Sequence, residues 1–119
     1  MYRFALLLLF YVPSFTAIAF GGEVEEVAKL AEKYSAQAEV RLYNGVRVDL
    51  LSKEYAIEAD WPHKWQEAVG QSLYYAILTD KKPAIILLVT DPKNEMRDCE
   101  RCQTVCAKYG IRLFIERIE

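Results

Sequence analysis

Apolar residues recur along this chain with two different periods, and each period predicts a different kind of element. Apolar residues three to four positions apart predict helices, which span residues 23–36, 63–79 and a segment from 91 or 94 to about 109. Alternation, or a short unbroken apolar run, predicts strands. The predicted strands are residues 39–43, 46–51, 55–60, 84–89 and 111–115. This α-β-β-β-α-β-α-β order predicts an α/β sandwich with a mixed central sheet.

Breaks in the pattern predict where these elements begin and end. Asn44-Gly45 between two alternating runs predicts a two-residue hairpin turn, because both positions of such a turn need positive φ. Pro62 fits the start of the second helix, where its missing N–H costs nothing. Residues 81–83, Lys-Lys-Pro, predict a turn before the fourth strand. Gly110 fits the position just after a helix, where a left-handed residue ends it.

Residues 1–19 have the layout of a secretory signal. Arg3 precedes an unbroken apolar run at 4–12, and Ala17-Ile18-Ala19 supplies the small residues that a signal peptidase reads. This order predicts cleavage after Ala19, which leaves residues 20–119 as a single domain in the periplasm or outside the cell. A retained membrane anchor is the alternative, although the segment is barely long enough to span a bilayer. After cleavage we expect no contact with the membrane.

The charge of the chain argues against a tight, nonspecific grip on DNA. The sequence has 15 Lys and Arg against 17 Asp and Glu, a net charge of −2, which becomes −3 when Arg3 leaves with the signal. Proteins that bind DNA by releasing counterions carry basic patches and are often basic overall. The overall balance therefore counts against a DNA partner.

Three cysteines, Cys99, Cys102 and Cys106, lie close together in the predicted third helix. Export would permit a disulfide, which would involve Cys102 and leave one thiol over. Buried free thiols are the alternative. A zinc or iron–sulfur site is less well supported, because the single histidine, His63, is distant in sequence. A redox function of the Cys-x-x-Cys pair also fits poorly, because such pairs lie at a helix N-terminus.

Three acids gather in the second and third predicted strands: Asp49, Glu58 and Asp60. The period of two places Glu58 and Asp60 on the same face of one strand. Carboxylates that are close together near a core repel each other and lose hydration. A hard cation with oxygen ligands would offset both costs. The alternative is a solvated sheet end, where the acids simply face water.

The helix after these strands carries polar groups along one stripe. Lys64, Ala68, Gln71 and Tyr75 are separated by four, three and four residues, so they share one face. Lys64 lies at the end of the helix nearest Asp60. The stripe thus brings an ammonium, an amide and a phenol beside the strand of carboxylates.

This ordered set of motifs resembles the core of the PD-(D/E)XK nuclease superfamily. The resemblance rests on residues 47–51, 56–60, 64–65 and 67–76. Gln71 with Tyr75 is similar to the Q-x-x-x-Y element of nuclease domains in bacterial recombination helicase–nucleases. The resemblance implies a restriction-endonuclease-like sandwich, and many proteins of that fold act as homodimers.

The resemblance also implies roles for the polar residues. Asp49 and Glu58 would bind Mg²⁺ or Mn²⁺, and the metal would polarise a scissile phosphate and activate a water. Asp60 stands where the family normally has lysine, and Lys64, one helical turn later, would orient the water in its place. The residues implied to contact nucleic acid are Gln71 and Tyr75.

An outlying acid would complete such a site, and the sequence leaves its identity open. Glu39 ranks first because it is close in sequence to Asp49, and Glu25 or Glu26 in the first helix is the alternative. A two-residue turn at 44–45 pairs residue 40 with 49, so Glu39 would lie on the face opposite Asp49. Only a three-residue loop or a bulge would bring these two acids together.

The sequence therefore predicts a metal-dependent phosphodiesterase that acts on DNA. The alternative is a binding or assembly module, in the periplasm or outside the cell, that keeps the nuclease fold without turnover. The acidic charge, the missing lysine at position 60 and export away from cellular DNA favour that alternative.

Overall fold

The computed structural model describes residues 21–119, so the expected signal and its cleavage after Ala19 lie outside the described residues. The helices are α1 (Gly21–Lys33), α2 (Trp65–Thr79) and α3 (Pro92–Tyr109), and a 3-10 turn, η1 (Pro62–Lys64), precedes α2. The strands are β1 (Gln37–Arg41), β2 (Arg47–Leu51), β3 (Tyr55–Asp60), β4 (Lys82–Val89) and β5 (Arg112–Arg117). No helix between residues 21 and 119 is both long and apolar enough to cross a bilayer.

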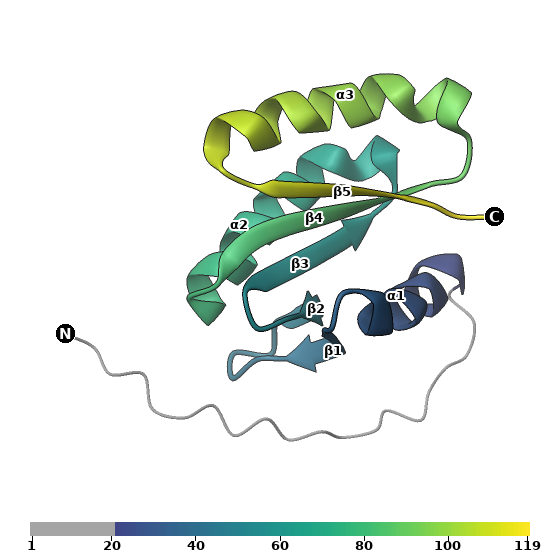
Figure 1. Cartoon of the computed structure of the whole chain (residues 1–119). Helices are drawn as coiled ribbons and strands as arrows, with labels where there is room; N and C mark the ends of the chain where they lie inside the picture. The colour runs from purple at the N-terminus through teal and green to yellow at the C-terminus, as the bar shows by residue number, and fades with distance from the viewer. Residues whose placement is uncertain (1–20) are drawn as a thin grey trace.

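The five strands form one mixed sheet in the order β1-β2-β3-β4-β5 (Figure 1). β1, β2 and β3 form an antiparallel meander, whereas β3, β4 and β5 run parallel. The expected α/β class, element order and mixed sheet are therefore confirmed. A specifically restriction-endonuclease-like arrangement is not.

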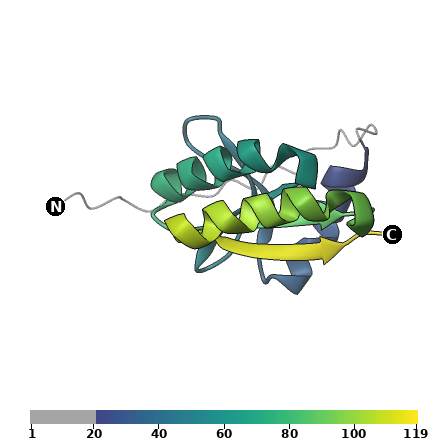
Figure 2. The same ribbon diagram turned by 90° about the horizontal axis from the view of Figure 1, so that it is seen from above.

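The two faces of the sheet carry separate cores. α2 connects β3 to β4, and α3 connects β4 to β5. Both crossovers are right-handed and move in the same direction across the sheet, so both helices lie on the same face. Figure 2 shows α2 and α3 side by side. Ile85 and Leu87 of β4 pack with these helices, whereas Ala84 and Ile86 belong to the core that α1 covers. This alternation follows from the period of two in a strand that is buried on both faces.

The β1–β2 hairpin has a three-residue loop, so the predicted two-residue turn is wrong. The Leu42 N–H donates to the Val46 carbonyl at 2.7 Å, and Val40 pairs with Val48. Gly45 takes a positive φ of 83° while Asn44 does not, which excludes the turn with two positive φ angles. The side chain of Asn44 instead accepts a hydrogen bond from the Val46 N–H at 3.2 Å.

Several other boundaries differ from the sequence pattern by one to three residues, among them β1, found at 37–41 instead of 39–43, and two of the differences have a clear cause. α1 ends at Lys33 because Ser35 is in the left-handed region, with φ of 50°. β4 begins at Lys82, where a turn was expected, and the Lys82 N–H donates to the Glu54 carbonyl at 3.0 Å. Pro83 is tolerated in this central strand because pairing with β5 starts only at Ala84. The predicted stop at Gly110 is confirmed by its φ of 69°.

The cysteines are free thiols, so the expected disulfide is not present in the structure. Cys102 and Cys106 are buried, with their sulfur atoms 3.7 Å apart, and Cys99 is partly buried beside them. Helical residues four apart have Cβ atoms about 5–6 Å apart, whereas a disulfide needs about 3.5–4.5 Å. The thiols pack as small apolar groups in the core beneath α3.

Candidate functional site

Side chains of Asp49 and Glu58 meet where β2 and β3 separate. The β2–β3 pairing includes Leu50 with Ile57, and the same register places Asp49 opposite Glu58. Asp49 Oδ2 accepts a hydrogen bond from the Ala59 N–H at 2.9 Å, so the carboxylate satisfies a buried backbone donor. Both acids are buried, which confirms that they do not simply face water.

Glu58 is the most perturbed acid of the site. Its side chain is 4% exposed, and its Oε2 atom has no hydrogen-bond partner within residues 21–119. Burial raises the pKa of Glu58 to about 10, helped by the charge and hydrogen bond of Asp49 and opposed by Tyr75. Burial also raises the pKa of Asp49, while the Ala59 N–H opposes this rise. At neutral pH the two carboxyls therefore share a proton.

Glu39 lies close to Asp49, because the three-residue loop puts residues 39 and 49 opposite each other. Its φ of 57° is in the left-handed region, which is unusual within a strand. Glu39 Oε2 forms an ion pair with Arg47 Nε at 2.7 Å. Burial raises the pKa of Glu39, Arg47 opposes the rise and Asp49 adds to it. The three-residue loop, which the sequence pattern did not predict, therefore brings Glu39 to Asp49.

A further acid, Glu23, comes from the first turn of α1 and was missed by the sequence analysis. Burial raises its pKa to about 7, and the charges of Asp60 and Asp49 add to the rise. Of its neighbours Glu25 and Glu26, the alternatives that the sequence offered, Glu25 is exposed and Glu26 pairs with Lys29 at 3.1 Å. The contact between α1 and the end of β3 is tertiary, so no local sequence signal identifies Glu23.

Asp60 and Lys64 lie at the open end of the cluster. Asp60 Oδ1 accepts a hydrogen bond from the Trp61 N–H at 2.8 Å. Burial raises the pKa of Asp60, while the Trp61 N–H and the charge of Lys64 oppose the rise. Lys64 is exposed, and its charge also opposes the rise in the pKa of Glu23. The proximity of Lys64 to Asp60, expected from the sequence, is thus found.

The predicted stripe on α2 is divided between core and solvent. Tyr75 is buried beside Glu58, and burial followed by the Glu58 charge raises the pKa of Tyr75. Ala68 is fully buried in the core under α2 and α3. Gln71 is exposed. The structure therefore places Tyr75, but not Gln71, with the acids.

The acid cluster gives no structural support to a divalent cation site. In the described part of the chain, no group of three or more His, Cys, Asp or Glu side chains is arranged to hold a metal ion. Hard cations prefer about six or more oxygen ligands, supplied by protein and water. The implied metal-binding site at Asp49 and Glu58 is therefore unsupported, and binding of Mg²⁺ or Mn²⁺ stays a prediction without structural backing.

A second polar feature lies on α3. Four exposed cations, here called the α3 basic stripe, are spaced by four, four and seven residues: Lys93, Arg97, Arg101 and Lys108. At about 100° per residue these positions fall within roughly 80° of arc, on the side opposite the buried Cys102 and Cys106. The stripe extends along about 22 Å of helix. Arg101 makes a long ion pair with Asp98, at 3.8 Å.

Comparisons with known proteins overturn the resemblance to nucleases. The chain is 32% identical over 91 residues to a putative KilA-N domain-containing protein of Acanthamoeba polyphaga mimivirus, covering 76% of this chain and 35% of the relative. A second protein of the same description and virus is 32% identical over 87 residues, covering 73% of this chain and 23% of the relative. No protein-family model matches the chain, and no solved structure matches it significantly.

These relatives carry the name of a different domain family from the PD-(D/E)XK nucleases. The predicted membership of the nuclease superfamily is therefore wrong, and so is the predicted metal-dependent phosphodiesterase. The alternative of an inactive nuclease-fold module outside the cell loses its support for the same reason. The chain spans about a third and a quarter of the length of the two relatives, so their whole activities are not transferred to it.

Proposed function

We propose that this chain is a nucleic-acid-binding domain whose partner is DNA, and that the α3 basic stripe contacts the phosphate backbone. The observation that carries the proposal is the stripe itself, with four cations on one exposed helix face. Residues four apart on a helix are about 6 Å apart along its axis, and each DNA strand presents a phosphate every 3.4 Å of axis. Each cation of the stripe can therefore neutralise a separate phosphate.

The relatives add independent support. Both are named for the KilA-N domain, and KilA-N domains bind DNA. Two of the acids of α3, Glu95 and Asp98, make contacts of their own, whereas Glu100 is exposed beside the stripe. Glu95 accepts hydrogen bonds from the backbone N–H groups of Thr90 and Asp91 at the start of the helix. Asp98 lies beside Arg101, while Lys93, Arg97 and Lys108 have no ion-pair partner among residues 21–119. A divalent cation and a homodimer are not part of the proposal.

The salt dependence of DNA binding tests this function. Four neutralised phosphates predict a slope of log K against log salt of about −3.6, so affinity should fall roughly a hundredfold between 50 and 200 mM salt. Fluorescence anisotropy with a labelled duplex measures this slope. The double variant Arg97→Gln/Arg101→Gln should lower its magnitude by about 2. EDTA in the buffer keeps divalent cations from contributing.

A matched control removes the same charge elsewhere. Lys29→Gln/Lys82→Gln also deletes two exposed cations, but from α1 and the start of β4. This control should keep the wild-type slope. No binding by the wild-type protein at 50 mM salt would refute the proposed function. Equal losses in the two double variants would refute the assignment of the stripe as the interface.

A further inference from the structure

A pocket of about 380 Å³ lies beside the ends of β2 and α2. It is formed by the turn after α1, the hairpin strands and the ends of β2 and α2. The lining residues are Ser35, Gln37, Leu42, Leu51, Ser52, Lys53, Thr79 and Lys81. Leu51 is the last residue of β2 and is paired with Ala56 near the start of β3, whereas Asp60 ends β3. Asp60 therefore lies at the far end of β3 from the pocket, whereas Asp49 is two residues from Leu51 along β2.

The charge of this pocket is positive. Lys53 and Lys81 line it, and no carboxylate of residues 21–119 does. Lys81 Nζ donates to the Lys53 carbonyl at 2.8 Å, which fixes one ammonium at the rim. α2 ends at Thr79, and a helix C-terminus carries a partial charge of about −0.5. Two ammonium groups outweigh that partial charge, so the pocket favours an anion.

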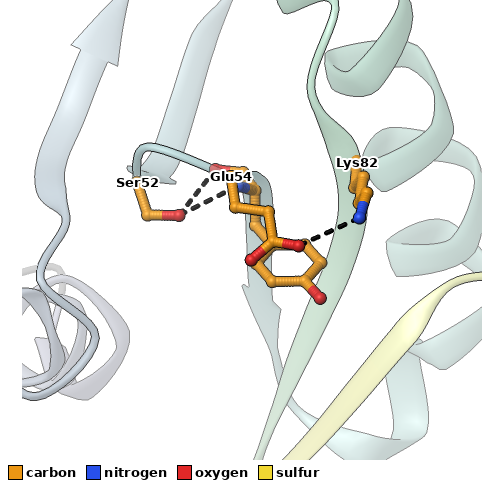
Figure 3. Close-up of polar contacts among 4 residues, drawn as sticks. Ser52, Glu54 and Lys82 are labelled. Atoms are coloured by element: carbon orange, nitrogen blue, oxygen red, sulfur yellow. Dashed lines mark hydrogen bonds and ion pairs between the residues drawn. The ribbon is translucent and has the colours of Figure 1, made fainter.

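The nearby acid Glu54 does not cancel this charge, because another lysine pairs with it. Figure 3 shows Lys82 reaching Glu54, with Nζ and Oε1 3.0 Å apart. In the same turn, the Ser52 hydroxyl accepts a hydrogen bond from the Tyr55 N–H at 2.9 Å and donates to the Tyr55 carbonyl at 3.3 Å. The turn that forms one wall of the pocket is thus held by its own hydrogen bonds.

Other donors of the pocket have no partner within the described chain. Thr79 donates its hydroxyl to the Tyr75 carbonyl at 2.7 Å, so that donor is used. The hydroxyl of Ser35 and the side-chain amide of Gln37 make no side-chain hydrogen bond between residues 21 and 119. Two neutral donors beside two ammonium groups match a phosphoryl dianion, whose oxygens only accept hydrogen bonds.

We propose that this pocket binds a phosphomonoester, with the phosphoryl group on Lys53 and Lys81. The apolar side chains of Leu42 and Leu51 line the same pocket and offer contact to a flat ring. Its volume lies within the range of small-molecule sites. The phosphoryl group comes either from a free mononucleotide or from the 5′-phosphate at the end of a strand. This site goes beyond backbone binding by the α3 basic stripe and does not depend on it.

Titration calorimetry at pH 7.5 with adenosine 5′-monophosphate, adenosine and inorganic phosphate tests the pocket. The monophosphate should bind at least tenfold more tightly than adenosine, and inorganic phosphate should compete with it. Amide NMR shifts on binding should concentrate at Ser35, Gln37 and Lys53. Equal binding of adenosine and its monophosphate, or shifts confined to other residues, would overturn the proposal.

Lys53→Gln should weaken binding of the monophosphate at least tenfold, and Lys81→Gln gives a second measurement. Lys29→Gln is the matched control, since this exposed lysine of α1 and its partner Glu26 both lie outside the pocket. It should change affinity less than twofold, and equal losses in Lys53→Gln and Lys29→Gln would overturn the proposal.

Two oligonucleotides that differ only in a 5′-phosphate distinguish the sources of the phosphoryl group. If the 5′-phosphate increases affinity and Lys53→Gln abolishes this increase, the pocket binds strand ends. If the mononucleotide binds but the 5′-phosphate does not increase the affinity of the oligonucleotide, the pocket binds a free nucleotide. If the mononucleotide does not bind and the 5′-phosphate has no effect, the proposed pocket is overturned. The double variant Arg97→Gln/Arg101→Gln should keep wild-type affinity for the mononucleotide. A failure of the α3 basic stripe as the DNA interface can therefore be distinguished from a failure of the pocket.

Discussion

Glu58→Gln tests the electrostatics of the acid cluster directly, because it removes a buried ionisable group and keeps its shape. Burial and the neighbouring Asp49 raise the pKa of Glu58 from 4.5 to about 10. Between these two values the folded protein holds a proton that the unfolded chain has released. The free energy of unfolding therefore falls as pH rises through this window. The glutamine variant has no proton to lose and should not show this part of the fall.

The size of the stability difference between Glu58→Gln and wild type depends only on the pKa of Glu58 in the unfolded chain, provided that its pKa in the folded protein stays above the pH of the measurement. Each pH unit changes the free energy of unfolding by about 1.4 kcal/mol. At pH 7, about 2.5 units above 4.5, Glu58→Gln should be more stable than wild type by about 3 kcal/mol. At pH 5.5 the difference should shrink to about 1.4 kcal/mol. The side chain is 4% exposed, so solvent screens this difference little.

Urea unfolding monitored by tryptophan fluorescence, at several values between pH 5.5 and 8 and in EDTA, measures the difference. Glu32→Gln is the control, because this glutamate is exposed on α1 and outside the cluster. The control should differ from wild type by a small amount that changes little with pH. A Glu58→Gln stability difference that does not grow with pH would refute the shared proton. A variant less stable than wild type throughout would refute the reasoning that the buried charge is costly.

Two further predictions concern the thiols and the N-terminus. In native, air-exposed protein only Cys99 should react rapidly with iodoacetamide, because Cys102 and Cys106 are buried. Unfolding without a reductant should expose all three thiols to the reagent. Fewer than three labels after unfolding, counted by mass spectrometry, would show that a disulfide is present. Protein isolated from its native host should begin at Phe20 if residues 1–19 are a cleaved signal, and an intact Met1 in a membrane fraction would favour the anchor.

The regular parts of the fold were predictable because they depend on local periodicity. The strand at 55–60 matches β3 at both ends, and Gly110 ends α3 as expected. The hairpin was not predictable to the residue, because Asn-Gly suits both a two-residue turn and a longer loop that ends in a left-handed glycine. This single residue of loop length decides whether Glu39 meets Asp49.

The acid cluster was predictable in part for the same reason. The pairing of Asp49 with Glu58 follows from strand register, and the approach of Lys64 to Asp60 follows from the short turn between β3 and α2. Glu23 reaches the cluster only because α1 packs against the end of β3, and this contact has no local signature. An ordered set of acids, lysine and tyrosine was therefore found in space, without the glutamine and without establishing the family that it resembled.

The negative net charge of the chain is a poor guide to its partners, because the charges are unevenly placed. Several of the acids gather at one end of the sheet, where burial raises the pKa values of Glu23, Asp49 and Glu58 and reduces the negative charge carried there at neutral pH. Lys64 and Arg47 are exposed beside these acids, whereas other exposed cations lie on α3 and at the pocket that Lys53 and Lys81 line. At physiological ionic strength exposed charges more than about 8 Å apart are largely screened from each other. A phosphate near α3 therefore responds to the charges of that helix, which are four cations and the acids Glu95, Asp98 and Glu100, more than to the overall balance of −2.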